Sequence, residues 1–113
     1  MVKRITLAEA HTEQRAATSG ALVDAGFEVE AYGTGEAALE AVRARPPDAL
    51  VTDLTLGGIC GAELAARARI SCPGGRLFVV ALAERGDAAP PSAFDEVLHK
   101  PVVIDELIAL LRR

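Results

Sequence analysis

Short apolar runs typical of buried strands alternate with helix-like segments along the whole chain of 113 residues. This alternation is the pattern of a parallel sheet covered by helices on both faces. A chain of this length can build one packed core but not two, so we expect a single domain over residues 1–113. The pattern predicts an α/β fold with strands at residues 3–8, 27–32, 49–53, 77–82 and 96–98.

The helices are expected between these strands, at about residues 12–25, 34–45 and 61–70, with a last one from residue 104 onward. Gly26 supplies the left-handed residue that commonly ends a helix, and Thr34 can cap the second helix. The stretch 83–93 holds two prolines, a glycine and no full amphipathic period. We therefore expect the helix before the fifth strand, the fourth in the chain, to be short or missing.

Charge and hydropathy exclude several classes of function. The net charge is −4, and the basic residues are scattered, so the chain lacks the positive surface of a nucleic-acid-binding domain. No apolar stretch approaches the roughly 20 residues that span a bilayer, and we expect a cytoplasmic protein without membrane contact. Cys60 and Cys72 have neither the spacing of a metal pair nor that of a disulfide framework.

Three chemically important residues lie at or just after the ends of predicted strands. Glu9 follows the first strand, Asp53 ends the third, and Lys100 comes after the fifth. In an open parallel sheet, the carboxyl ends of the strands meet at one edge, where ligands bind. Two neighbouring carboxylates are tolerated where a hard cation such as Mg²⁺ neutralises them. A nucleophilic carboxylate, a cation and an ammonium group are together suited to accepting a phosphoryl group.

At these residues the chain resembles the receiver domain of two-component response regulators. The most specific pieces are residues 47–56 (PDALVTDLTL) with Gly61 after them, and residues 99–102 (HKPV). Residues 26–29 and 33–39 resemble the family's second strand and second helix. The resemblance implies a flavodoxin-like (βα)5 fold of the CheY-like superfamily, with strand order 2-1-3-4-5.

The resemblance also implies roles for individual residues. Asp53 would accept a phosphoryl group from a histidine kinase or phosphotransfer protein, and Lys100, with a peptide bond to Pro101 that can be cis, would contact that group. Glu9, Asp53 and the backbone carbonyl of Thr55 would hold Mg²⁺. The domain would signal through a downstream protein partner or output domain. Its own chemistry would be limited to slow self-phosphorylation and dephosphorylation rather than enzymatic turnover.

Several positions depart from the family pattern. Ala10 replaces the second acid, which predicts weaker metal binding, and Ala83 replaces the Ser/Thr whose hydroxyl follows the phosphoryl group. Glu84 stands at a position that is small in the family and can repel an incoming phosphoryl group. Val97 replaces the aromatic switch residue, and Gly57 replaces a proline.

These departures leave two alternatives to a phosphorylated receiver. One is a pseudo-receiver that binds protein partners without phosphorylation. The other is a flavin mononucleotide binder, although residues 9–12 (EAHT) lack a phosphate-binding cradle. His11 is either a substitute metal ligand or a solvated residue at a helix start, and His99 is expected to be an ordinary surface residue.

Overall fold

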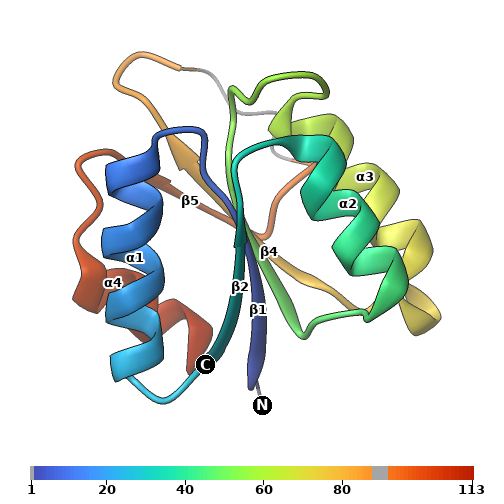
Figure 1. Ribbon diagram of the computed structural model, residues 1–113, viewed down its shortest axis with the longest axis horizontal. Coiled ribbons are helices and arrows are strands. Elements are labelled where there is room, and N and C mark those ends of the chain that lie inside the picture. Colours follow the sequence, from blue (N-terminus) through green and yellow to red (C-terminus); the bar gives the residue numbers. More distant parts are fainter. Residues whose placement is uncertain (1, 88–91) are drawn as a thin grey trace.

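The computed structural model describes residues 2–87 and 92–113. Within them lies one sheet of five parallel strands in the order β2-β1-β3-β4-β5, as predicted (Figure 1). Each strand begins and ends within one residue of its predicted limits. The strands are β1 (Arg4–Ala8), β2 (Glu28–Tyr32), β3 (Ala49–Asp53), β4 (Phe78–Ala83) and β5 (Glu96–His99).

Four α-helices accompany the sheet: α1 (Thr12–Asp24), α2 (Gly35–Ala44), α3 (Gly61–Ser71) and α4 (Ile104–Leu111), with a short 3-10 turn, η1 (Pro73–Gly75). Residues 84–87 and 92–95, which lie between β4 and β5, form no helix. The expectation of a short or missing helix before β5 is therefore confirmed for these residues. Its middle part, 88–91, lies outside the described residues.

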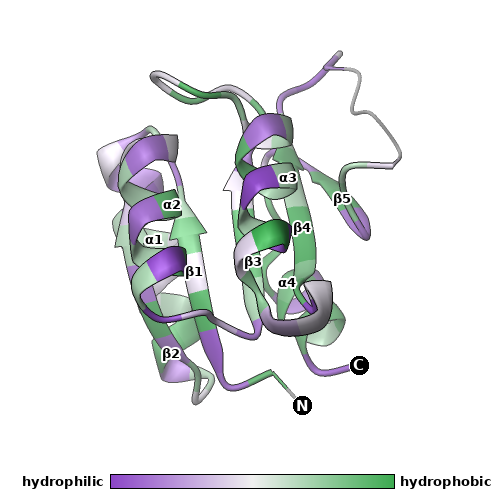
Figure 2. Cartoon of the chain, turned by 90° about the vertical axis from the view of Figure 1, so that its right-hand side faces the viewer, coloured by the Kyte–Doolittle hydropathy of each residue, from purple (hydrophilic) through white to green (hydrophobic). Residues whose placement is uncertain are grey.

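The helices cover the sheet on both faces, with α1 and α4 on one side and α2 and α3 on the other (Figure 1). Because successive side chains of a strand point to opposite faces, each strand contributes to two aliphatic cores. Val51 of β3 packs with Leu22 and Leu107 from α1 and α4, whereas Leu50 packs with Leu39 and helix α3. Figure 2 shows the resulting hydrophobic strands between helices whose outer faces are hydrophilic.

Local sequence signals explain where elements begin and end. The Thr34 hydroxyl accepts a hydrogen bond from the Ala37 amide and caps α2, as predicted. Gly26 adopts φ 103° after α1, a left-handed conformation that favours glycine. At the amino-terminal end of the sheet, the Asp48 carboxylate accepts hydrogen bonds from the backbone amides of Lys3 and Arg4, fastening β1 beside β3.

Strand register brings the predicted functional residues to one edge. Asp53, the last residue of β3, pairs with Leu82 of β4, and Ala83 pairs with His99 of β5. Lys100 follows His99 directly, and its amide donates to the Ala83 carbonyl at 2.8 Å. Among the helices in the described residues, none has the length and hydropathy needed to cross a bilayer.

Candidate phosphoryl-acceptor site

The Lys100 ammonium connects the predicted functional residues. Its Nζ lies 2.9 Å from Glu9 Oε1 and 2.9 Å from Asp53 Oδ1. The lysine side chain is only 10% exposed, and both carboxylates are almost completely buried. The three strand ends that the sequence predicts to converge therefore do so, in a cluster that carries two negative charges and one positive charge when fully ionised.

Asp53 is held by the backbone on two sides. Its Oδ2 accepts a hydrogen bond from the Ala10 amide at 3.0 Å, so residue 10 contributes to the site through its backbone. Helix α3 begins against Asp53, and a Cβ at Gly61 would collide with the Asp53 carbonyl oxygen. Glycine at position 61 thus lets α3 begin in direct contact with the backbone carbonyl of Asp53.

Glu9 is the most unusual ionisable group of the site. It is 1% exposed, and burial together with the neighbouring Asp53 carboxylate raises its pKa from 4.5 to about 7 despite the attraction of Lys100. Its Oε2 atom accepts no hydrogen bond from the described residues. The Glu9 backbone is held on both sides, since its amide donates to the Tyr32 carbonyl and its carbonyl accepts from the Arg15 guanidinium.

Lys100 remains charged in this setting. Burial by itself lowers the pKa of an ammonium group, but the contacts with Glu9 and Asp53 outweigh it and raise the pKa of Lys100 to about 12. The peptide bond between Lys100 and Pro101 is cis, as the resemblance allowed. Lys100 thus keeps a positive charge 2.9 Å from Asp53 Oδ1.

The positions that depart from the family pattern lie around the Asp53 carboxylate. Ala83 is fully buried at the end of β4, where its methyl group offers no hydroxyl, and Glu84 places Oε1 3.4 Å from Lys100 Nζ. Glu84 and Thr55 line a pocket that also contains Asp53. Val97 of β5 packs against the core under α2 and α3. The role of the Thr55 carbonyl as a metal ligand stays a prediction.

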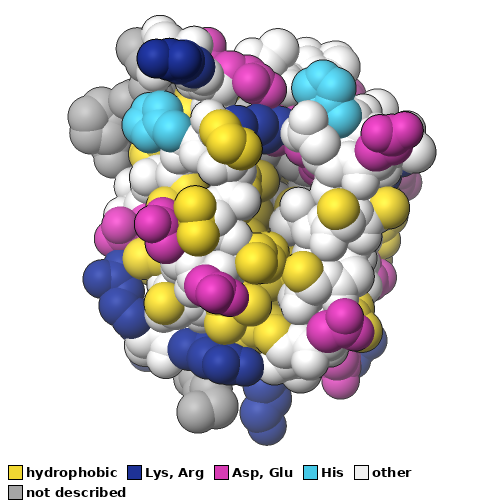
Figure 3. Space-filling model, turned by 90° about the vertical axis from the view of Figure 1, so that its left-hand side faces the viewer, with side chains coloured by type: hydrophobic (Ala, Val, Ile, Leu, Met, Phe, Trp, Pro, Cys, Tyr) yellow, Lys and Arg dark blue, Asp and Glu magenta, His cyan; other side chains and the backbone are white. Residues whose placement is uncertain are grey.

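The histidines differ in position. His11 Nδ1 lies 3.9 Å from Glu9 Oε2, and His11, Glu9 and Asp53 can bring one ligand atom each within 4.8 Å of one another. His99 is exposed on β5, as expected. Figure 3 shows both histidines on the surface at the same end of the molecule.

Two further residues, which we did not predict from the sequence, support the site. Gln14 in the first turn of α1 accepts a hydrogen bond from Lys100 Nζ at 2.9 Å. Glu36 accepts a hydrogen bond from the Ile59 amide at 3.0 Å and so fastens the loop after β3 to α2. Gln14 could have been found from its place in the first turn of the helix that follows Glu9. No comparable sequence signal predicts that Glu36 binds the Ile59 amide, because the two residues lie 23 positions apart.

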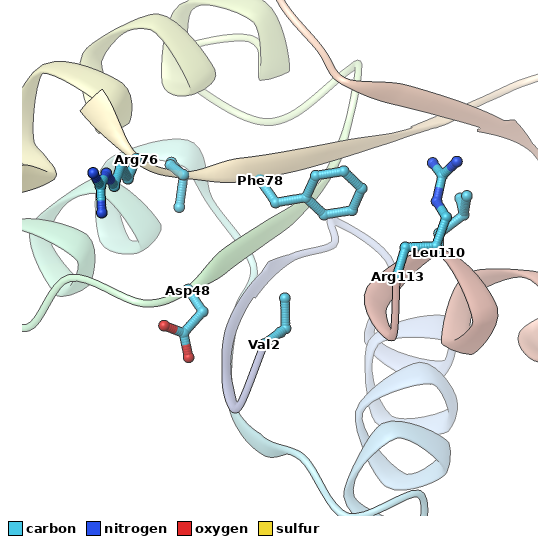
Figure 4. Close-up of a pocket in the computed structure, with 7 residues that line it drawn as sticks. Val2, Asp48, Arg76, Phe78, Leu110 and Arg113 are labelled. Atoms are coloured by element: carbon cyan, nitrogen blue, oxygen red, sulfur yellow. The ribbon is translucent and has the colours of Figure 1, made fainter. Parts of the chain in front are cut away.

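A second pocket lies at the opposite end of the strands (Figure 4). Val2 and Phe78 form an apolar surface there, between Arg76 on one side and Arg113 on the other. Asp48, the acid in this pocket, already binds two backbone amides, and these contacts lower its pKa. The grouped carboxylates and ammonium of the molecule are at the Asp53 edge instead.

Comparisons with known proteins agree with this geometry. The family model of the response regulator receiver domain matches residues 5–112. The response regulator receiver protein CpdR of Brucella abortus is 33% identical over 95% of this chain and 92% of its own length. The transcriptional regulatory protein TcrA of Mycobacterium tuberculosis is 34% identical over 96% of this chain, which spans only 44% of TcrA.

Solved structures give the same result. A CheY-like receiver domain from Methylobacillus flagellatus has the same fold, with a TM-score of 0.88 at 24% identity over 99% of this chain and 98% of its own. A putative response regulator from Chloroflexus aurantiacus has a TM-score of 0.84 at 27% identity, and both chains are covered completely. These relatives give no support to the pseudo-receiver or flavin alternatives. The chain belongs to the response regulator receiver domain family, a family of signalling domains.

Proposed function

We propose that this receiver domain accepts a phosphoryl group on Asp53 from a histidine kinase or a phosphotransfer protein in a phosphorelay. One observation carries the proposal: the buried Asp53 carboxylate at the end of β3 lies 2.9 Å from the Lys100 ammonium. A carboxylate beside a fixed positive charge is placed both to attack phosphorus and to have the negative charge of the phosphoryl group neutralised.

The reaction is a transfer between two nucleophiles. An Asp53 oxygen attacks the phosphorus of phosphohistidine, the phosphorus–nitrogen bond breaks, and the departing imidazole takes a proton from water. The product is an acyl phosphate on Asp53, and water can later attack its phosphorus to release phosphate. Lys100 can move its contact from the carboxylate to a phosphoryl oxygen, because its Nζ already touches Asp53 Oδ1.

The residues present fit a divalent cation. Glu9 Oε2 is a buried oxygen without a hydrogen bond among the described residues, and one ammonium serves two carboxylates. Glu9, Asp53 and the Thr55 carbonyl would supply the protein oxygens. When bound, Mg²⁺ neutralises charge on the phosphoryl oxygens. With Ala10 in place of a second acid, we expect weaker Mg²⁺ binding than in receivers with both acids.

Intact-mass spectrometry after incubation with acetyl phosphate and excess Mg²⁺ tests the proposal. The wild type should gain one phosphate, and Asp53→Asn should gain none. Asp87→Asn is the matched control, since Asp87 is an exposed acid of the same pocket and should leave the gain intact. If all three folded proteins remain unmodified, Asp53 is not a competent acceptor and the pseudo-receiver alternative replaces this proposal.

The proposal has further features. Residues 1–113 would act as one domain, located in the cytoplasm, and would signal by contact with a downstream protein or output domain. The fully buried Ala83 and the core residue Val97 lack the hydroxyl and the aromatic ring of the usual switch. We therefore infer that phosphorylation is signalled mainly by residues near Asp53 rather than through β5.

A further inference from the structure

The imidazole of His11 stands at the mouth of the acidic site. His11 is the N-cap residue of α1, but its side chain makes no capping hydrogen bond. The side chain is 61% exposed, and its Nδ1 is directed toward the site, 3.9 Å from Glu9 Oε2. It is therefore free to bind something other than the helix backbone.

The oxygen that His11 approaches is the unpartnered one. Glu9 is 1% exposed, its Oε1 is bound to Lys100, and its Oε2 has no hydrogen-bond partner in the described part of the chain. A buried carboxylate oxygen without a donor is costly unless a cation or water completes it. Asp53 also reaches this point, since ligand atoms of Glu9, His11 and Asp53 lie within 4.8 Å of one another.

Residue 10 leaves room for this arrangement. Ala10 offers only a methyl group to the pocket that it shares with His11 and Asp53. A separation of 3.9 Å is about 0.9 Å wider than that of adjacent octahedral ligands about 2.1 Å from one ion, and rotation of the exposed imidazole toward Glu9 would close this difference on binding. Two carboxylates and one imidazole form a mixed oxygen–nitrogen ligand set.

We propose that His11 supplies a nitrogen ligand at this site, so that the site prefers a borderline first-row ion such as Co²⁺ over Mg²⁺. Imidazole suits such ions, whereas Mg²⁺ prefers oxygen ligands and gains little from it. The inference deepens the proposed function and rests on its cation site, but not on phosphoryl transfer. It predicts that this receiver uses a cation different from the one that an all-oxygen site would select.

Titration of the full chain with Co²⁺ and with Mg²⁺, without any phosphodonor, tests this inference. We expect the wild type to bind Co²⁺ at least about tenfold more tightly than Mg²⁺, with a change in the Co²⁺ visible absorption that reports nitrogen ligation. His11→Ala should lose about tenfold in Co²⁺ affinity and the spectral change, with Mg²⁺ affinity almost unaltered. His99→Ala removes the only other histidine and should behave as wild type.

Two results would overturn the inference: unchanged Co²⁺ affinity in His11→Ala, or equal losses for both ions. The first would mean that His11 is not a ligand, and the second that the substitution disturbs the site as a whole. Because the titration contains no phosphodonor, its outcome is independent of the mass measurement on Asp53. If the chain binds Co²⁺ through His11 but gains no phosphate, this inference stands and the proposed function is wrong.

Discussion

Lys100 and Asp53, from the loop after β5 and the end of β3, form an ion pair of 2.9 Å although 47 positions separate them in the chain (100 − 53). The same ammonium lies 2.9 Å from Glu9 and 3.4 Å from Glu84. Three acids thus share one positive charge at this site. Its contribution to stability, and the effect of each acid, can be measured separately.

Replacing Lys100 by methionine should destabilise the fold by about 3 kcal/mol at pH 8, because two buried carboxylates would lose their counter-charge. Urea unfolding followed by circular dichroism measures the difference. The control is Lys3→Met, which removes the only other lysine, an exposed one. Equal losses of unfolding free energy in the two variants would show that the ion pair with Asp53 does not stabilise the fold.

Glu9 should make stability fall as pH rises. Its folded pKa is about 7 against an ordinary 4.5, so between these values the folded chain holds a proton that the unfolded chain has released. The stabilisation is fully present below pH 4.5 and is lost as pH passes 7. Glu9→Gln, which imitates the protonated form, should be more stable than wild type at pH 8 by about 1–3 kcal/mol.

The measurement is chemical denaturation from pH 5 to pH 8 for wild type and Glu9→Gln. Their difference in unfolding free energy should grow across this range. Glu40→Gln removes an exposed acid of α2 and serves as the control for net charge. A constant difference between wild type and Glu9→Gln would contradict the raised pKa.

Glu84→Gln should accelerate phosphorylation by acetyl phosphate. It removes a negative charge that competes for Lys100 and repels the phosphodonor, while keeping the side-chain shape. About 1 kcal/mol of repulsion corresponds to roughly a fivefold change in rate. Time-resolved intact-mass measurement gives the rate, with Asp105→Asn on the exposed face of α4 as the charge control. A rate no higher than that of the control would mean that Glu84 does not hinder the donor.

Gly61→Ala should destabilise the fold by about 1–3 kcal/mol and slow phosphorylation, because the new Cβ would press on the Asp53 carbonyl. Gly20→Ala in α1 is the matched control, since its Cβ would meet no atom within 4 Å. That change should stabilise the helix by about 0.5–1 kcal/mol. Thermal unfolding of both variants measures their stability. A Gly61→Ala variant as stable as wild type would show that α3 can shift away from Asp53.

Ala10→Asp should increase Mg²⁺ affinity and lower the stability of the metal-free protein, because it adds another acid beside Glu9 and Asp53. Calorimetric titration with Mg²⁺ and unfolding in a chelator measure the two effects. Ala66→Asp adds the same charge on an exposed part of α3 and should change neither. Unchanged Mg²⁺ affinity in Ala10→Asp would refute the assignment of residue 10 as the missing ligand position.

Much of this site could be predicted from the sequence because it depends on strand ends. The apolar runs and the residues that interrupt them define where β1, β3 and β5 end. Because parallel strands of one sheet end at the same edge, Glu9, Asp53 and Lys100 come together there. The absence of a hydroxyl at position 83 is also evident from the sequence, because the residue there is alanine. These conclusions rest on chain connectivity and residue chemistry alone.

Tertiary structure decided what those residues touch. That Glu84 reaches Lys100, that Gln14 shares its ammonium, and that His11 faces the unpartnered oxygen of Glu9 depend on side-chain rotamers and loop paths. Such contacts join segments up to 86 positions apart, and burial decides their strength. The sequence by itself determined the fold and the identity of the reactive residues, whereas their pairing and their pKa values arise only when packing removes water from around them.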